Sequence, residues 1–138
     1  IAVGHATSPF ISVYPWSAGG FGSRFSNPGT LPASQANALA FSPDGAFIAV
    51  SHDNSPYVSV YPWSAGGFGT KVANPGTLPA GGGYGVAFSP DSAFIAVAHG
   101  TSPYVSVYPW SAGGFGTKVA NPGTLLQATA SGVAFGIL

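Results

Sequence analysis

The sequence contains no cysteine, no methionine and no glutamate, and it carries very little charge. Only 4% of the 138 residues are charged, against about 25% in an average soluble domain. Without cysteine the chain can form neither a disulfide framework nor a thiolate metal site. The three basic residues are scattered and no apolar run approaches the length of a membrane span. We therefore expect no nucleic-acid partner and no membrane insertion.

The residues that are abundant point to a folded β protein. The chain is 46% hydrophobic and 14% aromatic, with 21 glycines and 13 prolines. Disordered chains have few aromatics and low hydrophobicity, so this composition suits short strands, many turns and a packed core. The sequence opens on Ile1 without a methionine. We expect it to be processed, trimmed or part of something longer.

A repeat of 47 residues organises the whole sequence. Residues 57–78 and 104–125 are identical, and several short motifs recur at the same step. Self-similarity at this period is typical of modular folds. We interpret residues 1–138 as a single module with repeats of approximately 1–47, 48–94 and 95–138. The recurring tripeptides are Ile-Ala-Val, which starts at Ile1, Ile48 and Ile95, and Tyr-Pro-Trp, which ends at Trp16, Trp63 and Trp110.

Each repeat contains four short β-prone runs separated by turn signals. In one such unit, residues 84–120, we expect strands over 84–88, 93–99, 104–108 and 115–120, with Pro109 ending the third because proline cannot donate to a ladder. No helical periodicity is present. Four strands in a unit of this length predict an all-β fold made of four-stranded antiparallel β-propeller blades. A β-solenoid is the alternative, although its coils are usually shorter.

Two sequence runs carry a family resemblance. The run VAFSPDSAFIAVAH, residues 86–99, resembles the first hairpin of WD-repeat propellers and of bacterial relatives called YVTN-type. The run AVAHGTSPYVSVY, residues 96–108, resembles a propeller repeat of bacteriophage and bacterial proteins. No Gly-His pair precedes the inner strand, and Ser follows the tryptophan where the WD pattern has Asp. The buried hydrogen-bond network of that family is therefore not carried over, and the resemblance implies a rigid platform that binds partners.

Three blades are too few for the usual propeller of four to eight. The sequence starts on the second strand of a blade and ends on a first strand over 132–137, so one blade is split between the termini. We predict that the chain is its own partner, in a homo-oligomeric ring. A six-bladed dimer is favoured over a nine-bladed trimer, and a segment of a longer single-chain propeller is the third alternative.

Two sets of repeated side chains are the candidate binding residues. His5, His52 and His99 occur once per repeat at the end of the second strand; each is either a binding group or an imidazole bonded to the neighbouring turn. The tryptophans Trp16, Trp63 and Trp110 precede a Gly-rich hairpin. They either stack on a ligand such as a sugar or pack between blades. We expect no metal site, because equivalent histidines of successive blades lie too far apart.

The sequence predicts a protein that is not an enzyme and has no cofactor. It holds no nucleophile–base–acid pattern, no paired acidic residues and no phosphate-cradling motif. The leading hypothesis is a structural or adhesive propeller of a phage virion or an extracellular assembly, presenting repeated loops. One alternative is a lectin-like propeller that binds glycans. The other is an engineered or recently amplified symmetric propeller without a selected ligand.

Overall fold

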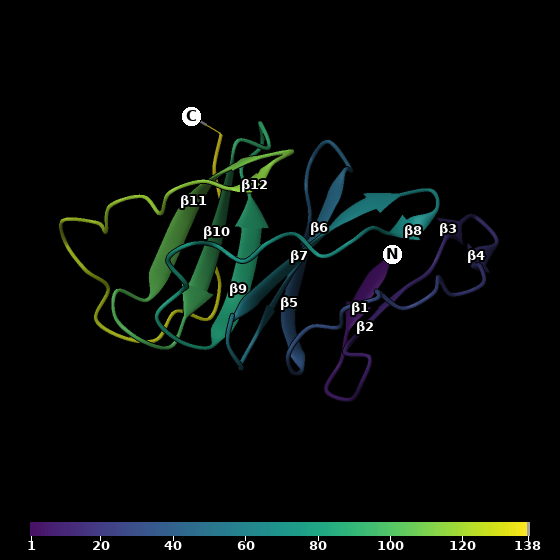
Figure 1. The fold of residues 1–138 in the computed structure, drawn as a ribbon, viewed down its shortest axis with the longest axis horizontal. Coiled ribbons are helices and arrows are strands. Elements are labelled where there is room, and N and C mark those ends of the chain that lie inside the picture. Colours follow the sequence, from purple (N-terminus) through teal and green to yellow (C-terminus); the bar gives the residue numbers. More distant parts are fainter. Residues whose placement is uncertain (138) are drawn as a thin grey trace.

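The computed structural model describes residues 1–137 as an antiparallel β structure without helices (Figure 1). No segment of that range is therefore a helix that could span a membrane. The strands are short and lie in four small sheets. Their bounds are β1 Ala2–Gly4, β2 Ile11–Val13, β3 Trp16–Ser17, β4 Gly20–Phe21, β5 Ala36–Phe41, β6 Phe47–His52, β7 Val58–Ser64, β8 Gly67–Phe68, β9 Gly83–Phe88, β10 Phe94–His99, β11 Val105–Ser111 and β12 Gly114–Phe115.

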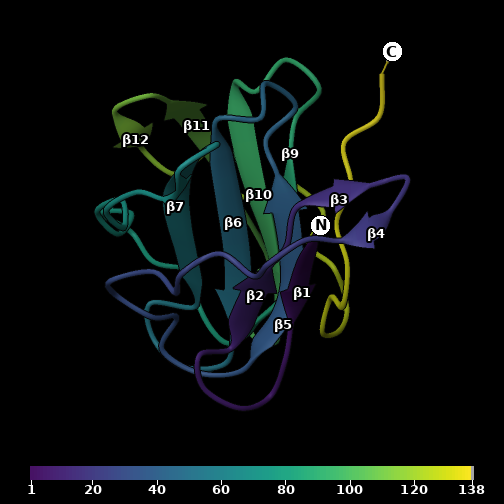
Figure 2. The ribbon, with the colours of Figure 1, turned by 90° about the vertical axis from the view of Figure 1, so that its right-hand side faces the viewer.

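The 47-residue repeat is visible in the sheets. The strands β5-β6-β7-β8 form one four-stranded sheet in sequence order, and β9-β10-β11-β12 form the next. Before β5 only the two-stranded sheets β1-β2 and β3-β4 are present. In the structure the first repeat is the β1–β4 unit, the second is the β5–β8 sheet and the third is the β9–β12 sheet. The three units stand beside one another as a fan, with the first repeat at one side of the molecule (Figures 1 and 2). All-β architecture and four-stranded antiparallel sheets are thus confirmed.

The hydrophobic core lies at the junctions between the three units. One buried cluster joins β6 and β7 to the third-repeat strands β9, β10 and β11, and a second joins β2 to β6 and β7. Alternation along the strands supplies both clusters, because successive side chains point to opposite faces of a sheet. In β6, Phe47 and Ala49 join the first cluster, whereas Ile48 and Val50 join the second.

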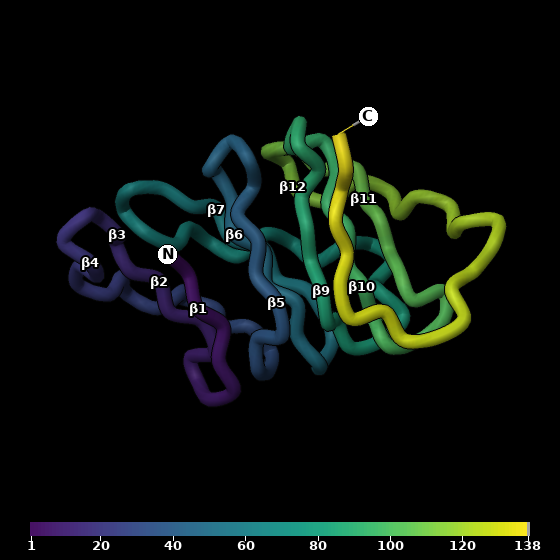
Figure 3. The backbone as a smooth tube through the Cα atoms, turned by 180° about the vertical axis from the view of Figure 1, so that it is seen from behind, coloured from purple at the N-terminus to yellow at the C-terminus, as the bar shows by residue number. Residues whose placement is uncertain are grey.

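The C-terminal segment, residues 130–137, runs beside β9 (Figure 3). A Cβ added at Gly85 would lie 2.8 Å from the Cα of Gly132, so glycine is required for this close approach. The amide of Ala130 donates to the carbonyl of His99 at 3.3 Å, and Ala36 makes the same 3.3 Å bond to His5. The segment therefore occupies the place that an inner strand takes in the earlier repeats.

The expected turns are confirmed, and they explain two acidic residues. The amide of Ser92 donates to the carbonyl of Ser89 at 2.8 Å and closes the Ser-Pro-Asp turn. The Asp91 carboxylate accepts from the Ser89 hydroxyl and from the Ala93 amide. These bonds lower the pKa of Asp91, and the same arrangement at the Ser42 turn lowers the pKa of Asp44. Both aspartates are turn formers.

Three expectations about the strands are wrong, and two of them concern β11 and its outer neighbour. Pro109 lies inside β11 rather than at its end. Its carbonyl accepts from Gly116, so its nitrogen faces the outer edge, where a missing N–H costs no ladder bond. The outer strand is expected over 115–120 but covers only Gly114–Phe115. Beyond Gly116 the chain makes a single backbone hydrogen bond to β11, from the Val119 amide to the Val107 carbonyl, and one bond does not make a ladder.

The strand expected over 132–137 is likewise wrong. Within the described chain, residues 130–137 form no ladder with another strand, although they lie beside β9. Strand structure requires a hydrogen-bonded partner along its length. The segment has the position of a strand but lacks that partner.

Candidate binding site at the sheet junctions

The three histidines lie on three different units and do not converge. Each imidazole is bonded through Nε2 to a serine on the adjacent strand, at distances of 3.0 to 3.1 Å. The serine lies seven residues after the histidine, so the pair spans the hairpin between the second and third strands. The pairs are His5 with Ser12, His52 with Ser59, and His99 with Ser106.

The His52 pair shows how the proton is arranged. Its Nδ1 lies 2.8 Å from the Asn54 carbonyl, which can only accept, so Nδ1 carries the hydrogen. Nε2 is then an acceptor, and Ser59 donates to it. Burial lowers the pKa of His52, and burial also lowers the pKa of His99. Both imidazoles are fully buried, so they hold strands together rather than face a ligand.

The three tryptophans have identical local sequences but different surroundings. Trp110 is 6% exposed, Trp63 is half-buried and Trp16 is 61% exposed. The Trp110 ring meets Phe47 of the preceding unit edge to face, and Trp63 meets Phe25 in the same manner. At these two positions the packing interpretation is therefore the one the structure supports.

Two pockets occur at equivalent places on successive junctions. The first junction pocket has a volume of about 210 Å³ and the second about 350 Å³. Each takes a Gly-Thr pair from the loop of one repeat and a Phe-Gly-Thr-Lys run from the next. The first is lined by Gly29, Thr30, Phe68, Gly69, Thr70 and Lys71, and the second by Gly76, Thr77, Phe115, Gly116, Thr117 and Lys118.

A lysine on each pocket wall is held by an asparagine of the following loop. Lys71 Nζ donates to Asn74 Oδ1, and Lys118 Nζ donates to Asn121 Oδ1. Burial lowers the pKa of Lys71. Each junction pocket thus combines one aromatic ring, two threonines and one oriented amine, a set that can stack on and hydrogen-bond to a polyhydroxylated ligand.

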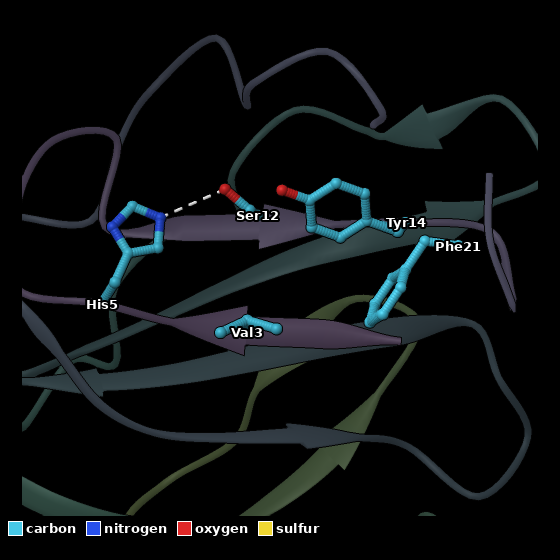
Figure 4. Close-up of a pocket in the computed structure, with 5 residues that line it drawn as sticks. All are labelled: Val3, His5, Ser12, Tyr14 and Phe21. Carbon is cyan, nitrogen blue, oxygen red and sulfur yellow. Dashed lines mark hydrogen bonds between the residues drawn. The ribbon is translucent and has the colours of Figure 1, made fainter. Parts of the chain in front are cut away.

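A third hollow, of about 410 Å³, lies on the first repeat (Figure 4). It is lined by Val3, His5, Ser12, Tyr14 and Phe21. These positions correspond to Val50, His52, Ser59, Tyr61 and Phe68 one repeat later. Of those five, all but Phe68 are fully or almost fully buried. The hollow is therefore the uncovered face of a sheet rather than a separate kind of site.

The chemistry available within residues 1–137 is limited. No group of three or more His, Asp or Glu side chains in this range is placed to hold a metal ion. The Ser–His pairs resemble a nucleophile and its base, but His52 and Ser59 are buried and are bonded to no carboxylate. The junction pockets are consequently the best candidate for ligand binding.

Sequence reasoning missed the junction pockets. It selected the tryptophans and histidines, of which Trp110, His52 and His99 are buried, and passed over the pocket-lining phenylalanines that follow the tryptophans. Each pocket joins residues about 40 positions apart on two repeats, so local sequence does not reveal it. The available signal was the 47-residue step itself, which places Gly-Thr once per repeat and Phe-Gly-Thr-Lys in two repeats, with Phe-Gly-Ser-Arg at the equivalent place in the first.

Comparison with known proteins gives a structural match only. No family model matches the chain, and no curated protein is similar to it. Among solved structures, the one described as "Structure of U3-55K" superposes with a TM-score of 0.61 at 15% sequence identity. The match covers 88% of this chain and 35% of that one, so the chain spans about a third of its length. At this identity the likeness concerns the fold alone.

Proposed function

We propose that the four-stranded sheets are propeller blades and that the chain is a non-enzymatic binding scaffold. The observation that carries this proposal is the recurrence of one pocket at two successive junctions, with the same residue types in the same order. Identical sites at fixed spacing bind multivalent surfaces with avidity that exceeds the affinity of one site. That property suits an adhesive component of a virion or an extracellular assembly.

Several features support the blade interpretation. Both four-stranded sheets keep their strands in sequence order, each sheet packs on the next, and the inner strands β5 and β9 lie close together. The resemblance of residues 86–99 to WD-repeat and YVTN-type propellers agrees with this interpretation.

The second part of the proposal is that the scaffold binds carbohydrate, and that the sugar site lies in the junction pockets rather than at the tryptophans. The lectin-like alternative places one shallow sugar site per blade on Trp, Tyr and Asn side chains, but Trp110 is buried. Phe68 and Phe115 are half-buried, with their rings in the pocket walls beside threonine hydroxyls. An aromatic ring flanked by hydroxyl and amine donors suits the apolar face and the hydroxyls of a sugar.

A broad glycan array tests this function. We expect the folded chain to bind one class of glycan, Phe68→Ala and Phe115→Ala each to weaken binding, and the double variant to weaken it further than either single variant. Ala65→Ser, on the exposed hairpin beside the first pocket, is the matched control. Absence of binding across the array would refute the carbohydrate assignment. Loss of all binding in only one single variant would refute the repeated site.

A further inference from the structure

Two apolar faces are exposed at opposite sides of the fan. The N-side face belongs to the first repeat, where Ile1 is 50% exposed and Trp16 is 61% exposed. The C-side face belongs to the third repeat, where Phe94 is 38% and Val119 is 41% exposed. The N-side face comprises Ile1, Val3, Tyr14, Trp16 and Phe21, and the C-side face comprises Phe94, Val105, Val107 and Val119.

Inside the molecule, residues equivalent to these two faces pack against each other. At the junction of the second and third repeats, Phe47, Val58, Val60 and Val72 meet Ile95, Val97, Tyr108, Trp110 and Phe115 in one cluster. The first group lies 47 residues before the C-side face. The second lies 94 residues after the N-side face. The internal junction is therefore a template for contact between the exposed faces.

We propose that the N-side face of one chain docks on the C-side face of a second copy, reproducing the internal junction. Trp16 then meets Phe94 of the other copy, as Trp110 meets Phe47 with ring centroids 5.1 Å apart. The Tyr14 hydroxyl faces the Thr124 carbonyl, as the Tyr108 hydroxyl donates to the Thr77 carbonyl at 2.8 Å.

The same docking provides the C-terminal segment with its missing partner strand. In the third repeat β9 pairs with β10 through Val86↔Val97 and Ala87↔Ala96. The β9 residues have equivalents 47 positions later in the C-terminal segment, and the β10 residues have equivalents 94 positions earlier in β1. The corresponding pairs between two copies are Val133 with Val3 and Ala134 with Ala2. Within residues 1–137, β1 is paired only with β2. Its free edge and the unpaired segment 132–135 are thus complementary in register.

Three observations favour a second copy over another kind of partner. The complementary surface is already present on this chain. The chain has no net charge, so two copies meet without charge repulsion. The contact joins two different faces, and such contacts form closed rings when the rotation between copies allows it. Two copies bring six repeats, which lies within the usual range of propellers.

Docking also completes a third junction pocket. Gly123 and Thr124 are the equivalents of Gly76 and Thr77, and both are exposed. The other wall comes from the second copy, where Phe21, Gly22, Ser23 and Arg24 correspond to the Phe-Gly-Thr-Lys run. The second copy therefore contributes residues to a site that one chain leaves unfinished.

Engineered cysteines test the register, because the chain has none of its own. Val3→Cys and Val133→Cys are made in separate chains carrying different tags, co-refolded and oxidised. We expect a disulfide between Cys-substituted positions 3 and 133 of the two chains, seen on a non-reducing gel as a band that carries both tags. Val3→Cys with Ala134→Cys is the matched control, since neighbouring strand residues point to opposite faces and should not cross-link.

Solution mass tests the association independently of any ligand. Light scattering of the unmodified chain is expected to give twice the 13.7 kDa of one chain at micromolar concentration. Trp16→Phe and Phe94→Ala should fold, by circular dichroism, and Phe94→Ala should weaken association by about tenfold or more. A trimer mass with the Val3–Val133 cross-link would support the same docking in a larger ring.

Two results would overturn the proposal. One is a mass of 13.7 kDa at every concentration tested, with no Val3–Val133 cross-link. The other is an oligomer that cross-links as readily through the Ala134 control as through Val133, since the faces would then meet in another register. Neither result bears on glycan binding by the two complete junction pockets.

Discussion

Trp110 packs edge to face against Phe47 across the junction of two repeats, with ring centroids 5.1 Å apart and planes at 86°. The two residues are 63 positions apart in sequence, and both are buried. The indole also meets Phe88 and Phe115 of its own sheet. This contact links the stability of one sheet to the presence of its neighbour. It also makes the exposed fraction of each tryptophan depend on whether its repeat has a neighbouring repeat to pack against.

Phe47→Ala should therefore destabilise the fold strongly. Removing a buried phenylalanine leaves a cavity beside Trp110, and the expected loss is about 3–5 kcal/mol in the free energy of unfolding. Denaturant titration followed by tryptophan fluorescence measures the change. Because the junction lies within one chain, the loss should not vary with protein concentration.

Phe94→Ala is the matched control, because Phe94 is the same residue one repeat later and is 38% exposed. In dilute solution it should cost much less than Phe47→Ala. If the exposed faces dock between copies, its cost should increase with protein concentration. Equal losses for both variants at every concentration would contradict the difference in burial.

Much of the fold could be predicted from sequence because the signals are local. The 47-residue step, the Ser-Pro-Asp turns and the Val-rich runs each fix backbone structure within a few residues. Pro109 was misjudged because its tolerance depends on which edge of β11 its nitrogen faces, and that follows from the register with Ala93 and Gly116. The segment 132–137 was misjudged because a strand requires a partner, and local β propensity does not supply one.

The candidate site was harder to predict because it depends on neighbouring repeats. Trp16, Trp63 and Trp110 lie in the same tripeptide and have three different degrees of exposure. Their burial is determined by the residue across the junction, which is Phe47 for Trp110 and Phe25 for Trp63. The junction pockets are formed in the same way, so only the packing of successive sheets reveals them.

Replacing Ser51 and Ser59 by alanine should change the free energy of unfolding in opposite directions. The Ser51 hydroxyl is buried and has no hydrogen-bond partner within residues 1–137, and Ala98 holds the equivalent position in the next repeat. Ser51→Ala should raise the free energy of unfolding by about 1 kcal/mol. Ser59→Ala leaves the buried His52 Nε2 without its donor and should lower it by about 1–3 kcal/mol.

Thermal or denaturant unfolding of the two serine variants measures both changes. Ser12→Ala is the control for the second, because its histidine partner, His5, is only half-buried. A smaller loss is expected there, since water can replace the hydroxyl. Destabilisation by Ser51→Ala as large as that by Ser59→Ala would contradict the different hydrogen bonding of the two serines.

Gly114 and Gly20 offer a second matched pair, on hairpins of identical sequence. Both have positive φ, at 101° and 93°, so an alanine at either position is strained by about 1–2 kcal/mol. A Cβ at Gly114 would also lie 2.8 Å from Val72 Cγ1 across the junction, whereas a Cβ at Gly20 meets nothing within 4 Å. Gly114→Ala should therefore lower the free energy of unfolding more than Gly20→Ala. Equal losses of unfolding free energy in dilute solution would mean that the Val72 side chain moves aside without destabilising the fold.

Stability should fall as the pH decreases below about 6.5, the ordinary pKa of histidine. Burial lowers the pKa of His52 and of His99 in the folded chain, and the charge of Lys71 acts in the same direction on His52. Between the folded and the unfolded pKa, the unfolded chain binds more protons, so acid favours unfolding. The stabilisation is complete above pH 6.5 and decreases until the pH passes the folded pKa values.

Melting temperatures between pH 7.5 and 5 measure this dependence. The double variant His52→Gln/His99→Gln should flatten the curve across that window, even if its melting temperature is lower throughout. Hydrogen bonds lower the pKa of Asp44 and of Asp91, so these two carboxylates stay ionised between pH 7.5 and 5 and do not contribute to the slope there. A slope that persists unchanged in the double variant would show that groups other than His52 and His99 link protons to folding.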